Sequence, residues 1–332
     1  MMRAGERRSA SAPARVCLVG EDLDWLGGTS IQAAISMRVT FCCTWKSAPC
    51  SFAISTVGVI NNSAIFSDIW ATPEHSWAQF IATCAGWKSN RSNRLWPSKV
   101  KVRSEIPSAA GLASSAALCV AGVAASNGTA DFQYLSRECW FVEREILSRD
   151  VGPMDYFPCI VGGVIEASCG SSGVERIAQL NWPKDARLIV VDTLVKRDTS
   201  EVVSWKRSRW SHGDRSVARY ISSTKELALQ LSEILSRSPR PQLLEIGRIL
   251  TKAHVSLRDD MGVSNKIIED CVNTLLRSGA AGAKITGTGK GGCVFAVVHE
   301  TDMEQVLGAI KRMPVNAVGA SVDSEGVKLA ID

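Results

Sequence analysis

Apolar and polar residues are arranged in a way that predicts strands in the first third of the chain and helices in its last half. Residues 14–20 (ARVCLVG) form a short apolar run typical of a buried strand, and residues 29–45 continue with apolar, β-leaning character. The segment 52–69 divides into strand-like pieces around a turn at Asn61-Asn62. Residues 99–105 alternate valine with charge, as a half-buried strand does, so we expect a sheet in this part of the chain.

Helical spacing is moderate over residues 74–88 and clear over residues 132–149. In the second segment Leu135, Cys139, Val142 and Ile146 recur on one face, and a Gly-Pro pair at 152–153 ends it. Further elements are expected as helices at 215–236, 241–257, 264–277 and 303–313, strands at 187–192 and 293–298, and a mobile polar loop at 205–216.

This distribution of elements predicts an α+β protein with two lobes rather than a regular βαβ repeat. A length of 332 residues fits two domains or one large domain. Residues 1–12 are polar and basic, and we expect them to form a disordered tail. The N-terminal lobe is then expected at 13–185 and the C-terminal lobe at 186–332.

Composition and charge narrow the function classes only slightly. The net charge of +5 is mildly basic, and without a lysine-rich tail or an aromatic-interleaved basic run we expect no nucleic-acid partner. Eleven cysteines lack any CxxC pair or zinc spacing, which favours buried, reduced thiols in a cytoplasmic protein. The longest apolar run, 116–125, is too short to span a bilayer, so no membrane partner is expected.

Two glycine-rich segments have the composition of phosphate-binding loops. Residues 107–117 (PSAAGLASSAA) lead into an alanine-rich helix, whose first N–H groups are unpaired and attract anions. Ser114 or Ser115 can add a hydroxyl donor or a Mg²⁺ ligand, although a serine N-cap on a tightly packed helix explains the same residues. Residues 284–295 (KITGTGKGGCVF) have dinucleotide-type glycine spacing, but a strand follows them, so that interpretation fails and a hairpin turn remains possible.

Two acids stand where a helix or a turn can hold them. Glu143 lies beside the apolar face of the helix predicted at 132–149, and Asp155 follows a Gly-Pro-Met turn. Phosphoryl transfer needs a metal ligand and a group that orients or deprotonates the attacking hydroxyl, and these two acids can supply both. A solvated helix residue and a turn former are the structural alternatives.

A second acidic cluster follows the first predicted strand. Carboxylates can accept hydrogen bonds from vicinal hydroxyls, and an indole can cover an apolar sugar face, so the cluster suits a polyol or sugar. An acidic surface turn is the alternative. The cluster contains Glu21, Asp22, Asp24, Trp25 and the pair Gly27-Gly28. Arg15, within the strand, needs a partner or a ligand. It either pairs with one of these acids or contacts a transferring phosphate.

Three segments, taken in order, resemble the motifs of the GHMP kinase family (galactokinase, homoserine, mevalonate and phosphomevalonate kinases), and most closely those of its sugar kinases. Residues 12–28 (APARVCLVGEDLDWLGG), 107–117 and 284–293 (KITGTGKGGC) are similar to its first, second and third motifs. The resemblance implies a two-lobed fold, with an N-terminal lobe like ribosomal protein S5 domain 2 and a ferredoxin-like C-terminal lobe. It also implies an ATP- and Mg²⁺-dependent phosphotransferase that acts on an alcohol group.

The resemblance assigns roles by position. Asp155, in GPMDY, matches the catalytic aspartate, Arg15 the basic residue near the γ-phosphate, and Ser115 and Glu143 the Mg²⁺ ligands. The expected ATP contacts are Pro107, Ala109, Ala110, Gly111, Leu112, Ala113, Ser114, Ser115, Ala116, Gly287 and Gly289. The expected acceptor contacts are Glu21, Asp22, Asp24, Trp25, Gly27, Gly28, Tyr156 and Gly289.

Departures from the family pattern bear on the acceptor. Sugar kinases usually read GEHTDYxGG, where this chain reads GEDLDWLGG. The matching Asp24 and double glycine, which mevalonate kinases lack, favour a sugar or sugar-like polyol. Tyr156 replaces a glutamine, which argues against galactose itself. Ala113 replaces a glycine, and its methyl group is tolerated without cost only if the backbone φ is negative.

Several alternatives stay open from the sequence. The acceptor hydroxyl can belong to a mevalonate-like molecule or to threonine or homoserine, and some galactokinase-like proteins are non-catalytic ligand sensors. The basic stretch 196–219, with seven Lys and Arg, is either a solvated helix and loop or a cover for ATP or an anionic acceptor such as a uronic acid. The expected partners are ATP and a small polyhydroxylated acceptor, and the expected state is a monomer or homodimer.

Overall fold

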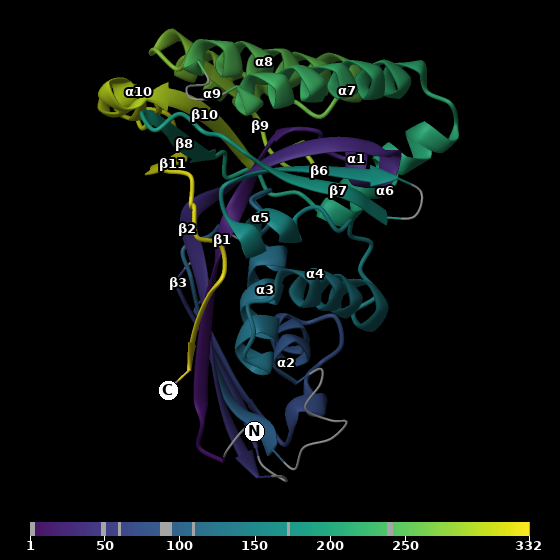
Figure 1. Ribbon diagram of the computed structural model, residues 1–332, viewed down its shortest axis with the longest axis vertical. Coiled ribbons are helices and arrows are strands. Elements are labelled where there is room, and N and C mark those ends of the chain that lie inside the picture. The colour runs from purple at the N-terminus through teal and green to yellow at the C-terminus, as the bar shows by residue number, and fades with distance from the viewer. Residues whose placement is uncertain are drawn as a thin grey trace.

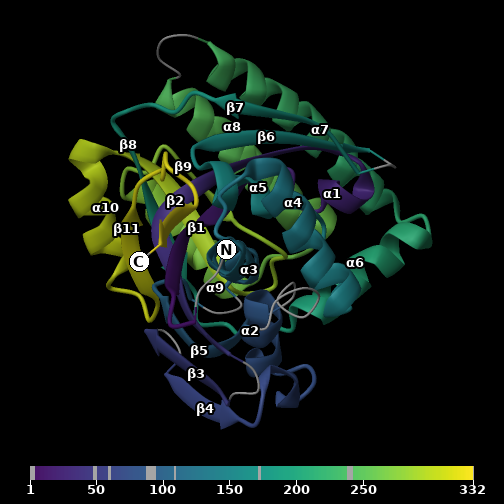
Figure 2. The same cartoon turned by 60° about the horizontal axis from the view of Figure 1, so that its bottom comes forward.

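The computed structural model describes residues 4–331 except 48–50, 59–60, 87–94, 108–109, 171–172 and 238–241. Two sheets with helices packed against them build the chain (Figure 1, Figure 2). This arrangement confirms the expected α+β fold with two lobes.

The first sheet belongs to the N-terminal lobe and is centred on a long strand, β2 (Gly28–Ser47). In β2 the odd-numbered residues 39–45 are buried, as the two-residue period of a strand requires. Strand β2 pairs antiparallel with β1 (Arg7–Val19), β5 (Leu95–Ser104) and β6 (Val164–Gly170). The remaining strands are β3 (Phe52–Gly58), β4 (Asn62–Phe66), β7 (Gly173–Leu180) and β12 (Lys328–Ile331).

Helices with many small residues cover one face of this sheet. Helix α3 (Ser114–Asn127) packs against β1 and β2, and α2 (Trp77–Gly86) packs against α3. A Cβ atom on Gly122 would lie only 2.7 Å from the Cβ of Cys84, so part of the small-residue density serves close helix packing. The other elements are α1 (Leu23–Leu26), α4 (Phe132–Phe141), α5 (Tyr156–Val161), the 3₁₀ turn Ile69–Ala71 and the π-helix Val142–Ile146.

The second sheet is antiparallel, has the strand order β11-β8-β10-β9, and belongs to the C-terminal lobe. Its strands are β8 (Ala186–Asp192), β9 (Gly282–Ile285), β10 (Cys293–His299) and β11 (Asn316–Ala320). The helices are α6 (Thr199–Ser211), α7 (Arg215–Ser236), α8 (Leu243–Ser256), α9 (Lys266–Arg277) and α10 (Met303–Ile310), with the π-helix Leu257–Met261 after α8 and a 3₁₀ turn at Glu300–Asp302. The strands predicted at 187–192 and 293–298 and the four last helices are therefore confirmed within the described residues.

Both ends of the predicted domain division need correction. Residues 7–12 are not a disordered tail, because they begin β1, which pairs with β2 and β12, and Ala10 and Ala12 are buried. At the other end, the C-terminal lobe does not extend to the last residue, because β12 returns to pair with β1 of the first sheet. Arg38 on β2 binds Asp323 and the carbonyl of Gly326, which fixes this returning segment.

Two predicted local structures are also wrong. The polar segment 205–216 is not mainly a loop, because residues up to Ser211 belong to α6, which Asp198 caps by accepting from the N–H of Glu201. The helix predicted at 132–149 changes to a π-helix at Val142. The wider turn shifts the helical faces, so that Ile146 is exposed and Glu143 is buried.

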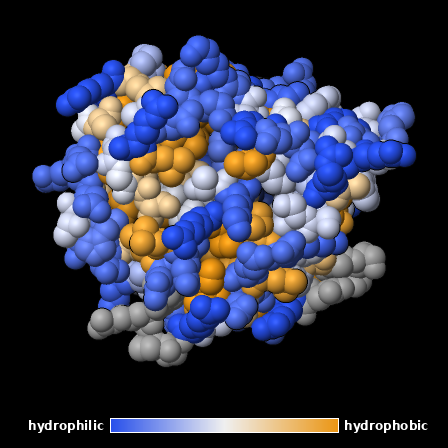
Figure 3. All heavy atoms as spheres, turned by 90° about the horizontal axis from the view of Figure 1, so that it is seen from above, coloured by the Kyte–Doolittle hydropathy of each residue, from blue (hydrophilic) through white to orange (hydrophobic). Residues whose placement is uncertain are grey.

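The surface formed over α7 and α8 is mostly hydrophilic, with separate apolar patches between the polar side chains (Figure 3). Leu229 on α7 and Leu244 on α8 are among the exposed apolar residues. Within the described ranges, every helix is too short or too polar to cross a membrane.

Candidate functional site

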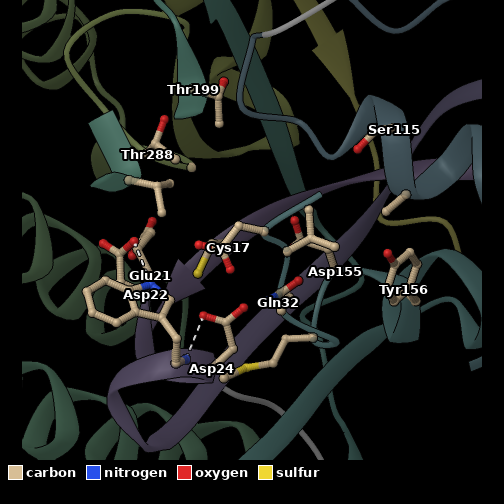
Figure 4. A pocket seen from close by; sticks show the side chains of 18 of the residues that line it. Cys17, Glu21, Asp22, Asp24, Gln32, Ser115, Asp155, Tyr156, Thr199 and Thr288 are labelled. Atoms are coloured by element: carbon tan, nitrogen blue, oxygen red, sulfur yellow. Dashed lines mark hydrogen bonds between the residues drawn. The ribbon is translucent and has the colours of Figure 1, made fainter. Parts of the chain in front are cut away.

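One pocket collects most of the residues that the three sequence motifs supplied. It lies where the end of β1, the start of α3, the turn before α5, helix α6 and the loop after β9 meet. Figure 4 shows Asp24 and Asp155 directed into this pocket, with Ser115 at the start of α3. The predicted residues that line it are Arg15, Glu21, Asp22, Asp24, Trp25, Ser115, Ala116, Glu143, Asp155, Tyr156 and Gly287.

The other predicted site residues lie outside the lining of this pocket. Gly27 and Gly28 end α1 and begin β2, where a Cβ on Gly28 would meet Leu23 and Lys225. Gly289 packs against Val263. Ser114 is the first residue of α3, and the segment before α3, beside the pocket, contains Pro107, Ala110, Gly111, Leu112 and Ala113. Ala109 lies outside the described residues.

Arg15 and Asp155 form a two-bond ion pair in the pocket, although 140 residues separate them in the sequence. Arg15 Nε donates to Asp155 Oδ1 at 2.9 Å and Nη2 to Oδ2 at 2.6 Å, while Nη1 donates to the carbonyl of Gly111 at 2.6 Å. The Arg15 side chain is only 7% exposed, and Asp155 is 38% exposed. Burial lowers the pKa of Arg15, but the charge and hydrogen bonds of Asp155, together with smaller contributions from Cys17 and Cys159, raise it overall. The pair thus fixes the Asp155 carboxylate at the end of a glycine loop.

Glu143 lies on the π-helix and is buried, with 1% of its side chain exposed. Tyr156 donates its hydroxyl to Oε1 at 3.1 Å, and Arg149 Nη1 donates to Oε2 at 3.1 Å. Burial raises the pKa of Glu143, and the charge and hydrogen bond of Arg149 oppose that rise. Tyr156, expected to contact the acceptor, is instead almost fully buried and holds this carboxylate.

Ser115 and Glu143 form a donor set that suits Mg²⁺, because a hydroxyl and a carboxylate of the same pocket are hard oxygen ligands. The described residues contain no group of three or more His, Cys, Asp or Glu side chains able to hold a metal ion. Arg149, which occupies one oxygen of Glu143, is 47% exposed and can leave it.

The acid-rich loop, residues 20–26, is held from the C-terminal lobe by buried side chains that sequence reasoning missed. Lys284 on β9 is fully buried and pairs with Glu21, and Lys206 on α6 is fully buried and pairs with Asp22. Tyr220 on α7 donates to the carbonyl of Glu21 at 2.7 Å. Glu21 and Asp22, expected to bind acceptor hydroxyls, are therefore engaged by lysines. The uncharged neighbours of Lys284 are a signal of its burial, whereas Lys206 stands next to Arg207 and carries no such signal.

Asp24 differs from its neighbours because its carboxylate forms no ion pair with any described residue. A Cβ atom on Gly152 would lie 1.6 Å from Asp24 Oδ2, so the glycine leaves room for this carboxylate. Burial, together with the charges of Asp155 and Asp22, raises the pKa of Asp24 to about 7. Oδ1 of Asp24 accepts the N–H of Trp25 at 3.1 Å, and the remaining hydrogen-bonding capacity of the carboxyl group is available to a ligand.

Because the pKa of Asp24 is raised in the folded protein, the free energy of unfolding depends on pH. Between about pH 4 and pH 7 the folded protein binds a proton that the unfolded chain releases, so raising the pH through this window destabilises the fold. We expect Asp24→Asn to be more stable than the wild type by about 2 kcal/mol at pH 8, and by much less at pH 5. Urea unfolding at both pH values measures this, and a difference independent of pH contradicts it.

The two glycine loops pack backbone against backbone, as the third motif implied. A Cβ on Gly287 would lie 2.8 Å from the Cα of Gly111, and a Cβ on Gly111 would lie 2.5 Å from the carbonyl oxygen of Thr286. Arg197 donates to the carbonyls of Gly289 and Gly291 at 3.0 and 2.6 Å. Bulky residues are therefore excluded at this contact.

Helix α3 starts without a serine cap. Its N-cap is Ala113, which has φ 56° and no capping side chain, so the interpretation of Ser114 or Ser115 as an N-cap is wrong. The N–H groups at the start of α3 remain open to an anion.

Ala113 is therefore in the strained conformation that glycine adopts freely. We expect Ala113→Gly to stabilise the protein by up to about 1 kcal/mol, because relief of left-handed strain exceeds the entropy cost of a glycine. Urea unfolding tests this, with Ala121→Gly in the interior of α3 as a control that should destabilise. If both variants lose stability, the prediction of backbone strain at Ala113 is contradicted.

Part of the basic stretch 196–219 reaches the pocket. Thr199, Val203 and Arg207 recur every four residues on one face of α6, and all three line the pocket. Arg209, in contrast, binds Asp214 and the carbonyl of Met261 away from the lining. The stretch is thus not merely a solvated helix and loop.

Comparison with known proteins gives matches in all parts of the chain. The models "GHMP kinases N terminal domain" and "GHMP kinases C terminal" match residues 81–163 and 234–316, and "Galactokinase galactose-binding signature" matches residues 3–44. A mevalonate kinase of Aeropyrum pernix is 29% identical over 96% of this chain and 97% of its own length. A galactokinase of Streptomyces coelicolor is 27% identical over 91% of this chain and 87% of its own.

Solved structures share the fold at low identity. Lactococcus lactis galactokinase complexed with galactose has a TM-score of 0.78 and 18% identity, over 97% of this chain and 95% of its own. Methanococcus jannaschii mevalonate kinase has a TM-score of 0.74 and 19% identity, over 95% and 98%.

Proposed function

Since this chain belongs to the GHMP kinase family, and is thus a phosphotransferase that acts on a hydroxyl group, we propose that it phosphorylates a sugar or sugar-like polyol with ATP. The observation that carries the proposal is the Arg15–Asp155 pair, which is bonded to the glycine loop at Gly111 and shares its pocket with Asp24. A phosphate donor and a polyol acceptor can therefore meet at one carboxylate.

Asp155 acts on the acceptor hydroxyl in this mechanism. Its carboxylate orients the hydroxyl and accepts its proton as the oxygen forms a bond to the γ-phosphorus, while the bond to the bridging β-phosphate oxygen breaks and ADP leaves. Arg15 keeps Asp155 in place and offsets negative charge on the phosphoryl group in transit. Positioning and electrostatics supply most of the rate.

The two glycine loops and the start of α3 bind the triphosphate. Open N–H groups at the start of α3 donate to phosphate oxygens, and the small residues before α3 admit them at close range. A bound Mg²⁺ would neutralise the negative charge on the phosphate oxygens. Ser115 and Glu143 are the residues that would hold it, with Arg149 released from Glu143.

The galactokinase-like first motif supports a polyhydroxylated acceptor. The carboxylate of Asp24 lies in the pocket without an ion pair, and Trp25 lies beside it. This combination suits a molecule with vicinal hydroxyls and an apolar ring face. A mevalonate-like acceptor is the second candidate, because the mevalonate kinase of Aeropyrum pernix covers nearly the whole chain at 29% identity.

Coupled measurement of ADP release against a panel of acceptors tests the proposal. The panel contains free hexoses and pentoses, uronic acids, cyclitols, mevalonate, threonine and homoserine. We expect turnover with a sugar or cyclitol. Turnover with mevalonate alone would replace the sugar by the second candidate, and acceptor binding with no turnover on any member would favour a ligand sensor.

The two serines at the start of α3 should differ in their dependence on metal. Ser115 lines the pocket and Ser114 does not, so Ser115→Ala should raise the Mg²⁺ concentration for half-maximal activity by about tenfold, and Ser114→Ala much less. Magnesium titrations of turnover at fixed ATP measure this. Equal effects of the two substitutions would remove Ser115 from the metal site.

A further inference from the structure

Arg207 is the basic residue of α6 that faces the pocket. It lies on the same helix face as Thr199 and Val203, and its guanidinium carbon lies 5.1 Å from the centre of the Trp25 ring. The arginine and the indole thus stand together on the acceptor side of the pocket, next to the acid-rich loop.

The hydrogen bonds of Arg207 are incomplete. Nη1 contacts Asp150 Oδ2 at 2.8 Å, in a pair whose side chains are 39% and 62% exposed. Exposed pairs of this kind contribute little and exchange readily. Nε, in contrast, is buried and has no partner among the described residues. A buried N–H without an acceptor is costly, and a planar guanidinium binds carboxylate or phosphate through two parallel bonds.

The other cations around the pocket are already committed. Arg15 uses its donors on Asp155 and Gly111, and Lys206 and Lys284 are fully buried on Asp22 and Glu21. These pairs neutralise three acids that would otherwise repel an anion. Asp24, whose pKa burial and nearby acids raise to about 7, carries only part of its charge near neutral pH.

We propose that the acceptor carries an anionic group, a carboxylate or a phosphate, and that Arg207 binds this group and so determines specificity. The proposal rests on the proposed function and narrows its substrate class to an acidic or phosphorylated sugar or polyol. In the bound state Arg207 exchanges Asp150 for the anionic group, and Trp25 covers the adjacent face of the acceptor.

The test compares matched acceptors that differ in the presence of one anionic group. Glucose, galactose and mannose are each assayed beside their uronic acids and their 1-phosphates, by calorimetric binding and by turnover. We expect at least one anionic form to bind more than tenfold tighter than its neutral parent, and the carboxylate and phosphate arms separate the two sources of charge.

Two variants should change acceptor binding in opposite directions, and a third variant is the control. Arg207→Gln should weaken binding of the preferred anionic acceptor about tenfold or more, with the KM for ATP unchanged. Asp150→Asn should tighten it severalfold, because the competing carboxylate is gone. Arg215→Gln, at an exposed arginine at the start of α7 outside the pocket, is the matched control and should change neither.

The outcomes separate this inference from the proposed function. Preference for neutral sugars, with Arg207→Gln and Asp150→Asn both without effect, overturns the inference and leaves the kinase proposal standing. Arg207-dependent binding of an anionic sugar without any phosphorylation would instead reject the proposed function and keep the inference. If no acceptor in the panel binds, the inference is rejected.

Discussion

Asp155→Asn is expected to lower kcat by about 10²–10⁴-fold while leaving ATP affinity close to that of the wild type. The amide has nearly the shape of the carboxylate, and its oxygen can still accept from Arg15. It can neither take the proton of the acceptor hydroxyl nor balance the guanidinium charge. The proposed ATP contacts come from other elements, namely the glycine loops and α3, so nucleotide binding should persist.

Two measurements make this prediction decisive. Calorimetric binding of a non-hydrolysable ATP analogue measures the affinity of the nucleotide site separately from turnover. Circular dichroism at the assay temperature shows whether the variant is folded. This control is needed because Arg15 is buried and loses its charged partner. A folded variant that retains turnover within tenfold of the wild type would remove Asp155 from the catalytic role.

Lys284→Met is expected to destabilise the fold by about 3–5 kcal/mol. The lysine is fully buried, and its ammonium group serves Glu21 and the carbonyls of Cys17 and Ile285. Without it, a buried carboxylate and two carbonyls lose their donor in a place that water does not reach easily. The contact also joins β9 of the C-terminal lobe to the end of β1, so both lobes are affected.

Urea unfolding of three variants separates charge loss from packing loss. Lys284→Met should be the least stable, and Lys284→Met combined with Glu21→Gln should recover part of the loss, because no unpaired charge is then buried. The conservative Lys284→Arg keeps the charge but not the shape. If the double variant is less stable than Lys284→Met alone, the ion pair is not the cause.

The sequence predicted the parts of the site that depend on local pattern. Glycines and small residues around 107–117 and 284–293 can be recognised because their function requires a bare backbone, and a lone arginine within an apolar strand demands a partner. The structure shows that this partner is Asp155, not one of the nearer acids Glu21, Asp22 or Asp24. Sequence proximity favoured the wrong acids because β1 and the turn before α5 meet only in the folded chain.

The misses share a physical cause, which is that local polarity does not report burial. The segment 205–211 has the composition of a solvated loop, yet it is helical, and Lys206 within it is fully buried because Asp22 lies opposite. The π-helix that turns Glu143 inward leaves no clear mark in a helical pattern. Partners supplied by distant elements, such as Lys284 for Glu21, cannot be inferred from spacing.

The return of β12 to the first sheet has a consequence for synthesis of the protein. The edge of β1 is covered by residues 328–331, which the ribosome makes some 300 residues later than β1 itself. During translation this edge is exposed, and an unpaired strand edge is a place where chains associate wrongly. The N-terminal lobe therefore completes its sheet only after residues 328–331 have left the ribosome, and the pairing of β12 is the closing step of folding for the lobe that was made first.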